Sequence, residues 1–215
     1  MNTIIRKYWR TAIFYLLTLL VSQTALSQPA LYVEGTHYTL LADNPLSRSQ
    51  QTIDKPLVTE IFWYGCPSCY NFDPLLSHWV EQQGDSIAFQ RSHTVWNSNT
   101  KRHATLFFAT SGLGINEKLH AQIFNEIHQK KNYLLDTESQ AEFLQAAGVE
   151  AAAADKALKS FTTDSQLRQA EALQRELKVP GIPCMIVKGR YMVNLGGPVR
   201  TYDDMLKIVD YLLDK

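Results

Sequence analysis

The 215-residue sequence has few cysteines, no excess of either charge and no apolar run long enough to cross a membrane. Its three cysteines are too few for a framework of structural disulfides, and their number is odd. Basic and acidic side chains number 21 each, so the charge gives no indication of nucleic-acid binding. We find no internal repeat. The length is enough for one core, or for one domain with a large insertion.

The first residues differ in composition from the rest of the chain. Three basic residues and no acidic one precede a ten-residue apolar run at 12–21, and small residues follow at Ala25 and Ser27. This pattern predicts a signal peptide at residues 1–27, cleaved before Gln28. A membrane anchor is the alternative, but the run is well short of the roughly 20 residues needed to span a bilayer. After cleavage the chain has 18 basic and 21 acidic side chains, and we expect no stable membrane insertion.

Apolar periodicity predicts an α/β domain that is interrupted by helices. The expected order is strand, helix, strand, a helical block, a hairpin and a final helix. Residues 28–56 are polar and rich in turn formers, apart from a short strand-like piece. The expected strands are 38–41, 57–63, 87–93, 185–187 and 191–195, and the expected helices are 67–83, 102–112, 116–130, 138–147, 151–160, 164–178 and a last one after 201.

Two cysteines separated by two residues stand where a strand meets a helix. Pro67 fits the first turn of a helix, which places Cys66 at the helix N-terminus and Cys69 one turn later. Unpaired backbone N–H groups and the helix dipole stabilise an anion at that end. We therefore expect the Cys66 thiolate to be favoured and to act as the nucleophile. Cys69, deeper in the helix, is expected to resolve the mixed disulfide.

The cysteine pair has two other interpretations. A zinc site needs four ligands, and neither the one remaining thiol, Cys184, nor the six histidines supply the usual spacing. A passive structural disulfide is the second alternative, but so short a loop constrains the unfolded chain little. The favoured interpretation is redox chemistry without a metal or any cofactor other than the redox-active disulfide Cys66–Cys69.

The motifs together resemble the DsbA family of bacterial periplasmic thiol oxidases. The resemblance covers the strand leading into Trp63–Tyr70, the distal Gly181–Pro183, the hairpin residues 188–191 and the helical block between them. It implies a thioredoxin fold with an inserted all-helical domain. The thioredoxin-like domain is then expected at 28–94 and 166–215, and the helical insertion at 95–165.

The resemblance assigns roles to individual residues. It implies that Cys66 is the nucleophile, that Cys69 resolves, and that Pro67 and Ser68 tune the redox potential. It also implies that Pro183 is a cis-proline lying against the disulfide, which exposes the Ile182 backbone to an extended substrate; the alternative is an ordinary trans-proline.

Glu60 matches a buried acid behind the active site of this family, a candidate for redox tuning by proton transfer with Cys69. The alternative is a solvent-facing strand residue, because burial cannot be read from one position. His93, at a strand end, is interpreted as a packed or surface histidine rather than a catalyst.

Two departures from the family pattern concern the strength of the redox chemistry. The best-known oxidases have histidine where this chain has Ser68, so we expect a weaker oxidant. Cys184 directly follows the proposed cis-proline; it is either an inert strand residue or close enough to exchange with the pair. Trp96 and the run 106–108 are interpreted as core of the insertion rather than a binding patch.

The resemblance implies a periplasmic thiol:disulfide oxidoreductase that introduces disulfide bonds into exported proteins. Its expected partners are unfolded or reduced exported proteins and a DsbB-like membrane protein that reoxidises it; no nucleic-acid partner is expected. A disulfide isomerase or reductase of the same fold is an alternative. A chaperone-like peptide-binding protein that keeps an unused cysteine pair is another.

Overall fold

The computed structural model describes residues 31–215 of the chain. The predicted signal peptide at residues 1–27 lies outside the described residues. Within the described part, no helix combines the length and the apolar character that crossing a membrane requires.

A five-stranded mixed sheet forms the centre of the fold, in the order β1-β5-β4-β2-β3. β2 and β3 are parallel, and the other neighbouring strands are antiparallel. β2 is buried along its whole length, which explains why its sequence reads as one short run of strand formers. The strands are β1 (Thr39–Leu40), β2 (Leu57–Phe62), β3 (Ala88–His93), β4 (Cys184–Val187) and β5 (Tyr191–Asn194).

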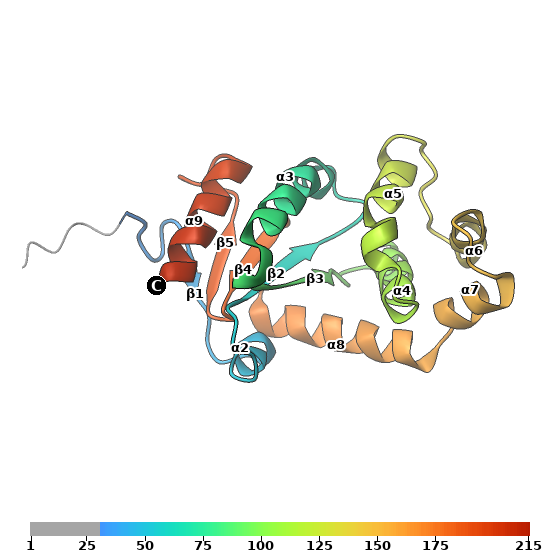
Figure 1. Ribbon diagram of the computed structural model, residues 1–215, viewed down its shortest axis with the longest axis horizontal. Coiled ribbons are helices and arrows are strands. Elements are labelled where there is room, and N and C mark those ends of the chain that lie inside the picture. Colours follow the sequence, from blue (N-terminus) through green and yellow to red (C-terminus); the bar gives the residue numbers. More distant parts are fainter. Residues whose placement is uncertain (1–30) are drawn as a thin grey trace, which may run out of the picture. The chain divides into compact units, whose positions relative to one another are not determined.

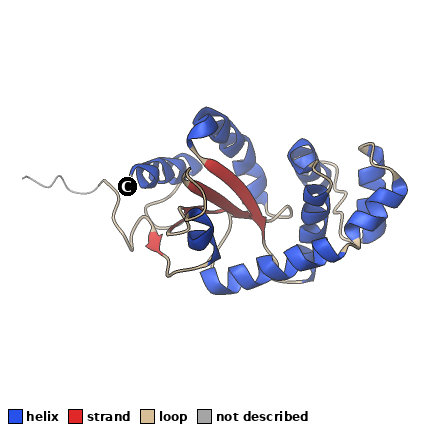
Figure 2. Ribbon diagram, turned by 60° about the horizontal axis from the view of Figure 1, so that its bottom comes forward, coloured by secondary structure: helices blue, strands red, loops and turns tan. Residues whose placement is uncertain are grey.

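Helices cover both faces of the sheet (Figures 1 and 2). α3 (Pro67–Gln83) and α9 (Tyr202–Asp214) pack on one face, where they share an apolar cluster with Val58 of β2. α2 (Pro45–Gln50) and the end of α8 (Phe161–Leu177) pack on the other face, with Ile61. A 3-10 turn, η1 (Gly84–Ser86), follows α3.

The helical block between β3 and β4 has the predicted number of helices. α4 (Ser98–Gly112), α5 (Asn116–His128), α6 (Thr137–Ala146) and α7 (Ala151–Leu158) precede α8. Leu167 and Ala170 of α8 pack into the core of this block, whereas Leu177 packs on the sheet. α8 is thus one helix that belongs to both regions and runs through residue 165. The α/β order with a helical insertion is confirmed; the boundaries at 94/95 and 165/166 stay predictions.

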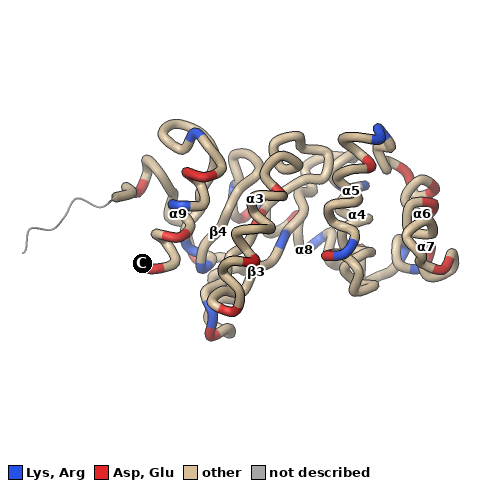
Figure 3. The backbone as a smooth tube through the Cα atoms, turned by 45° about the horizontal axis from the view of Figure 1, so that its top comes forward, with Lys and Arg blue, Asp and Glu red and all other residues tan. Residues whose placement is uncertain are grey.

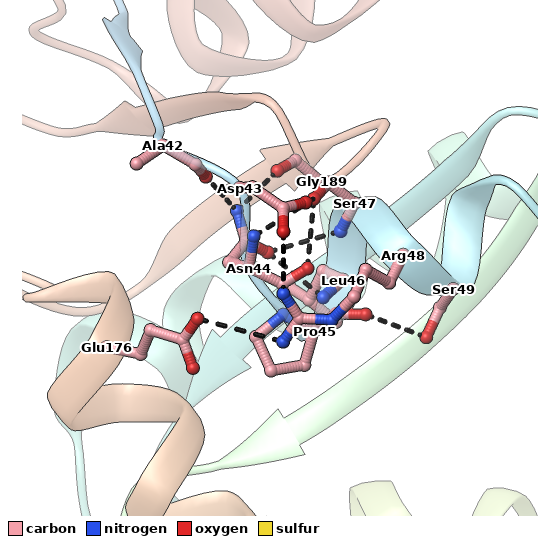
Figure 4. A network of polar contacts seen from close by, with 10 residues as sticks. All are labelled: Ala42, Asp43, Asn44, Pro45, Leu46, Ser47, Arg48, Ser49, Glu176 and Gly189. Carbon is pink, nitrogen blue, oxygen red and sulfur yellow. Dashed lines mark hydrogen bonds and ion pairs between the residues drawn. The ribbon is translucent and has the colours of Figure 1, made fainter.

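The short helix α2 was not expected from the sequence. Asn44 caps it by accepting from the N–H groups of Leu46 and Ser47, and its amide donates to Gly189 O at 2.8 Å (Figure 4). Gly189 has φ +61° in the β4–β5 turn, and a Cβ there would lie 2.1 Å from Ser47 N. The turn therefore needs glycine both for its backbone conformation and for the close approach of α2.

Charged residues of both signs occur around the sheet and around the helical block (Figure 3). Where they are exposed, several form local ion pairs, such as Arg48 with Asp43 at 2.8 Å and Arg175 with Glu171 at 2.9 Å. Exposed pairs of this kind contribute at most about 1 kcal/mol each, so they do not decide the fold.

Candidate functional site

Cys66 lies at the junction of β2 and α3 and caps the helix with its own sulfur. Its backbone is extended, and its Sγ accepts from the N–H of Cys69 at 3.4 Å. The Cys66 N–H donates to Trp63 O at 3.0 Å, which closes the turn that leads into the helix. Pro67 occupies the first turn, where its missing N–H costs no helical hydrogen bond.

The two cysteines of the pair have thiols of opposite acidity. Hydrogen bonds from the Cys69 thiol and from the backbone N–H groups of Cys69 and Ser68 lower the pKa of Cys66 to about 6. Burial, together with the hydrogen bond to Cys66, raises the pKa of Cys69 far above its usual range. Cys66 is 9% exposed and Cys69 fully buried. At neutral pH the pair therefore holds one thiolate, on the sulfur that a partner can reach.

The loop before β4 brings a residue distant in sequence to the reactive sulfur. The Ile182–Pro183 peptide bond is cis, as the resemblance implied. The carbonyl oxygen of Ile182 lies 4.0 Å from Cys66 Sγ. Asn194 of β5 donates to Gly181 O at 3.0 Å, which ties the loop to the sheet. A backbone carbonyl of this loop thus lies beside the thiol, where an extended peptide would meet both.

The Cys-Pro-Ser-Cys turn has a second anchor, which sequence reasoning missed. The hydroxyl of Tyr202, at the start of α9, donates to Ser68 O at 2.9 Å. The ring of Tyr202 stacks on Phe72 of α3 at 5.1 Å between centroids. In the sequence Tyr202 stands at the start of the last expected helix and has no feature that marks it as part of the site. Its role depends on the packing of α9 against α3, which no local pattern encodes.

Glu60 is buried in the centre of β2 on the face toward α3, so the solvent-facing alternative is wrong. Its Oε2 lies 3.1 Å from Nε of Arg91, the residue beside it on β3. Burial raises the pKa of Glu60 to about 7, although the positive charge of Arg91 opposes the shift. The carboxyl of Glu60 is therefore able to gain or lose a proton near neutral pH.

Arg91 connects Glu60 to a wider set of acids. Its guanidinium also lies 3.2 Å from Asp73 of α3 and 3.3 Å from Glu117 of α5. Burial disfavours the charge on Arg91, but Glu60 and Asp73 outweigh it and raise the pKa of Arg91. Asp73 also lies 3.1 Å from Nε2 of His120. This buried network joins β2, β3, α3 and the insertion behind the cysteine pair.

His93 is a packed histidine, as interpreted from the sequence. It is fully buried, its Nδ1 lies 2.8 Å from Thr94 O, and its Nε2 accepts from the N–H of Tyr64 at 3.2 Å. Burial lowers the pKa of His93 well below the usual histidine range, so the ring is neutral at physiological pH.

Cys184 is a buried residue of β4. It is fully buried beside Ile61 on the sheet face toward α2 and α8, whereas the cysteine pair lies on the α3 side. Burial raises the pKa of Cys184 to about 12. The sheet separates this thiol from the pair, which argues against exchange between them.

The apolar residues assigned to the insertion core divide into two groups. Leu106, Phe107 and Phe108 are buried in the core of the helical block, as predicted. Trp96 is 48% exposed, so its assignment to the core was wrong. It precedes the first turn of α4, where its N–H donates to Thr100 Oγ1 at 2.8 Å, and its side chain faces outward. Among residues 31–215 no group of three or more His, Cys, Asp or Glu is placed to hold a metal.

Comparisons with known proteins identify relatives over nearly the whole chain. The family model described as the DSBA-like thioredoxin domain matches residues 71–207. The thiol:disulfide interchange protein DsbA of Burkholderia cepacia is 35% identical over 197 residues, 90% of each chain. That of Azotobacter vinelandii is 30% identical over 210 residues, 91% of this chain and 96% of the relative. The crystal structure of Pseudomonas aeruginosa DsbA has a TM-score of 0.77 at 30% identity, covering 85% of this chain and 93% of that chain.

The range matched by the family model begins two residues after Cys69, so the geometry of α3 locates the reactive pair independently of that match. The comparisons confirm the thioredoxin fold with a helical insertion. The chain therefore belongs to the DSBA-like thioredoxin domain family, and its activity is that of a thiol:disulfide oxidoreductase.

Proposed function

We propose that this chain is a periplasmic dithiol oxidase that introduces disulfide bonds into exported proteins. The observation that carries the proposal is the asymmetry of the pair: Cys66 has a pKa of about 6 and Cys69 a strongly raised one. A stabilised thiolate on Cys66 stabilises the reduced form, which makes the corresponding disulfide oxidising. The basic and apolar start of the sequence supports export.

The reaction begins from the disulfide form of the pair. A substrate thiolate attacks Cys66 Sγ; a substrate–Cys66 disulfide forms and the Cys66–Cys69 bond breaks, with the electron pair leaving on Cys69. Because burial raises the pKa of Cys69, that sulfur takes up a proton. Glu60, with a pKa of about 7 and a charge that acts on Cys69, is the candidate proton donor in the buried region.

The second step releases the product. Another substrate thiolate attacks the substrate sulfur of the mixed disulfide and expels Cys66 as a thiolate, which its low pKa makes a good leaving group. Two electrons pass from the substrate dithiol to the pair, and the substrate leaves with a disulfide. A DsbB-like membrane partner then accepts the two electrons and restores the Cys66–Cys69 bond.

The cis-proline loop is proposed to bind the substrate. The Ile182 carbonyl beside Cys66 offers a backbone acceptor to an extended peptide, and Pro183 holds that loop against the pair. Pro67 and Ser68 are proposed to tune the redox potential through the first turn of α3, with Ser68 giving a weaker oxidant than histidine would. We propose residues 28–94 and 166–215 as the thioredoxin-like domain and 95–165 as the insertion.

The test of the redox direction is the equilibrium of the purified mature protein with reduced and oxidised glutathione. We expect the dithiol form to be strongly favoured, as in oxidants of this chemistry. An equilibrium in the range of reducing thioredoxins would contradict the oxidase and favour the reductase or isomerase.

Matched cysteine variants separate the oxidase from a peptide-binding protein. Cys66→Ser is expected to abolish oxidation of a reduced, unfolded substrate protein, by about 10³-fold or more since the attacked sulfur is lost. Cys184→Ser, a buried control on the other face of the sheet, is expected to keep activity within about twofold. If Cys66→Ser retained the biological activity, the cysteine pair would be unused and the oxidase proposal wrong.

A further inference from the structure

Three histidines hold the polar groups of Tyr64, two residues before Cys66. Nε2 of His93 accepts from the Tyr64 N–H at 3.2 Å, and Nε2 of His128 lies 2.8 Å from the Tyr64 carbonyl oxygen. Nδ1 of His120 lies 2.9 Å from the Tyr64 hydroxyl. We call His93, His120 and His128 the histidine clamp. Tyr64 is fully buried, so water cannot bind its polar groups, and the histidines provide their hydrogen-bond partners instead.

The clamp reaches Tyr64 from two different parts of the chain. His93 ends β3, whereas His120 and His128 lie two turns apart on α5 of the helical insertion. The His128 ring also stacks on Tyr70 of α3, with 4.7 Å between centroids and an interplanar angle of 8°. The insertion therefore contacts both the segment that enters the cysteine pair and the helix that follows it.

The partners of each ring fix the position of its proton. His93 Nδ1 faces the Thr94 carbonyl, so it carries the hydrogen and leaves Nε2 free to accept from Tyr64. The Tyr64 carbonyl only accepts, so His128 must carry its hydrogen on Nε2. The Tyr64 backbone is thus held between one histidine that accepts through Nε2 and one that donates through Nε2. Neither ring can change its proton position without losing that bond.

The position of Tyr64 determines where Cys66 begins the helix. The Cys66 N–H bonds to Trp63 O at 3.0 Å across the turn that contains Tyr64. The Trp63 indole lies against Gly65, where a Cβ would be 2.4 Å from the ring. Nε1 of Trp63 donates to Nδ1 of His103 at 2.9 Å, which adds an anchor from α4. Because the turn around Gly65 is tightly packed, a shift of Tyr64 should move Cys66 relative to the N–H groups at the start of α3.

We propose that the histidine clamp positions the reactive thiol: by fixing Tyr64, it sets the distance between Cys66 Sγ and the N–H groups of the first turn of α3. The inference rests on the proposed function, in which Cys66 is the exchanging sulfur. It gives the helical insertion a part in the reaction, since two of the three histidines belong to α5. In this proposal the clamp residues act on the thiol through Tyr64 and not by direct contact with a reacting atom.

The test compares two substitutions of His128 with a control. His128→Phe keeps an aromatic ring to stack on Tyr70 but removes the donor to the Tyr64 carbonyl; His128→Gln keeps a donor at a similar distance. His78→Phe is the matched control, because His78 is exposed on α3. The readout is the Cys66 pKa, followed by ultraviolet thiolate absorbance against pH, together with the glutathione equilibrium.

We expect His128→Phe to raise the Cys66 pKa by about half to one unit, a three- to tenfold loss of thiolate stabilisation, as for one lost hydrogen bond. The glutathione equilibrium should shift by the same factor toward the disulfide. His128→Gln should stay within about twofold of the wild type, and His78→Phe should be without effect. Equal shifts in His128→Phe and His78→Phe, or in His128→Phe and His128→Gln, would overturn the proposal.

A measurement on the wild-type protein tests the clamp even if a variant fails to fold. Nitrogen-15 NMR of the imidazoles is expected to show hydrogen on Nδ1 for His93 and on Nε2 for His128. The reverse tautomer at either ring would contradict the clamp. The proposed function is tested separately, because a wild-type protein that fails to oxidise a reduced substrate disproves the oxidase while leaving the pKa comparison readable.

Discussion

The sheet face toward α3 and the face toward α8 hold cysteines of opposite character. On the first, Cys66 ends the loop after β2 and has a pKa of about 6. On the second, Cys184 pairs with Ile61 inside an apolar cluster and has a pKa of about 12. Cys66 is 9% exposed and Cys184 is fully buried, a difference too small to explain their opposite pKa shifts.

The difference lies in the donors that face each sulfur. Cys66 Sγ receives the N–H groups of a helix first turn and the Cys69 thiol. Cys184 Sγ has one hydrogen bond that lowers its pKa, from the Asn194 side chain, and a 4.0 Å contact to the acceptor Met185 O, and burial outweighs that one donor. Donors stabilise a thiolate and acceptors do not. The low pKa of Cys66 thus depends on the neighbouring Cys69 thiol and on its place at a helix N-terminus, and Cys184 in β4 has neither.

The largest effect expected from this comparison is in thiol labelling. At pH 7 Cys66 is mostly thiolate, whereas about one Cys184 in 10⁵ is ionised. A more basic thiolate is also more nucleophilic, which reduces the expected difference in labelling rate by about 10² to 10³. Because Cys184 is fully buried, its labelling also requires local opening. We expect iodoacetamide to modify Cys66 at least about 10³-fold faster than Cys184. Mass spectrometry of the reduced protein over time measures the two rates. Denaturation should bring the two rates together.

A comparable labelling rate for Cys184 in the folded protein would show that the two faces do not differ in the way described. It would also reopen exchange between Cys184 and the pair. A disulfide map of the oxidised protein gives a second reading: only a Cys66–Cys69 bond is expected, since the sheet lies between the pair and Cys184.

The reactive face could be predicted from sequence where the signal is local. A strand, a glycine and Pro67 in the first helical turn fix Cys66 as a helix N-cap, and the structure has this arrangement. The apolar run of β2 is a local signal of the same kind. It predicts a buried strand, and the strand is buried because both faces of the sheet are covered. Such features depend on residues within about two turns of one another.

Contacts between distant segments could not be predicted in this way. Glu60 has a partner 31 residues later, in Arg91, and only the register of β2 against β3 brings them together. His120 and Tyr202 stand on amphipathic helices, where they look like ordinary positions, and their partners lie on α3 and in the loop before it. Trp96 was misassigned because an aromatic residue between elements can face either way.

A smaller effect concerns the buried acid on the reactive face. Burial raises the pKa of Glu60 to about 7, so the folded state binds its proton more tightly than the unfolded state. The stabilisation is therefore complete below about pH 4.5 and is lost as the pH rises through 7. The wild type should therefore lose up to about 3 kcal/mol of unfolding free energy between pH 4.5 and pH 8 that Glu60→Gln does not lose. Urea unfolding of both proteins across this pH range measures the difference.

Glu117→Gln is the matched control for this prediction. Glu117 contacts the same guanidinium at 3.3 Å, but its side chain is 84% exposed, so its removal should change stability by less than about 1 kcal/mol at any pH. A parallel pH dependence in wild type and Glu60→Gln would mean that Glu60 keeps an ordinary pKa. It would then be no candidate for proton transfer with Cys69.

The smallest effect comes from the dipeptide between the cysteines. Ser68 already supplies its backbone N–H to Cys66 Sγ, so its side chain can only add to that environment. Ser68→His places a positive charge there when the imidazole is protonated, and we expect it to lower the Cys66 pKa by about half to one unit. The glutathione equilibrium should move three- to tenfold toward the dithiol form. Ser68→Asn, neutral and of similar size, is the control, and labelling of Cys184 should stay as slow as in the wild type. Equal shifts from the two substitutions would assign the effect to shape rather than charge, and the expectation that serine weakens this oxidant would then be wrong.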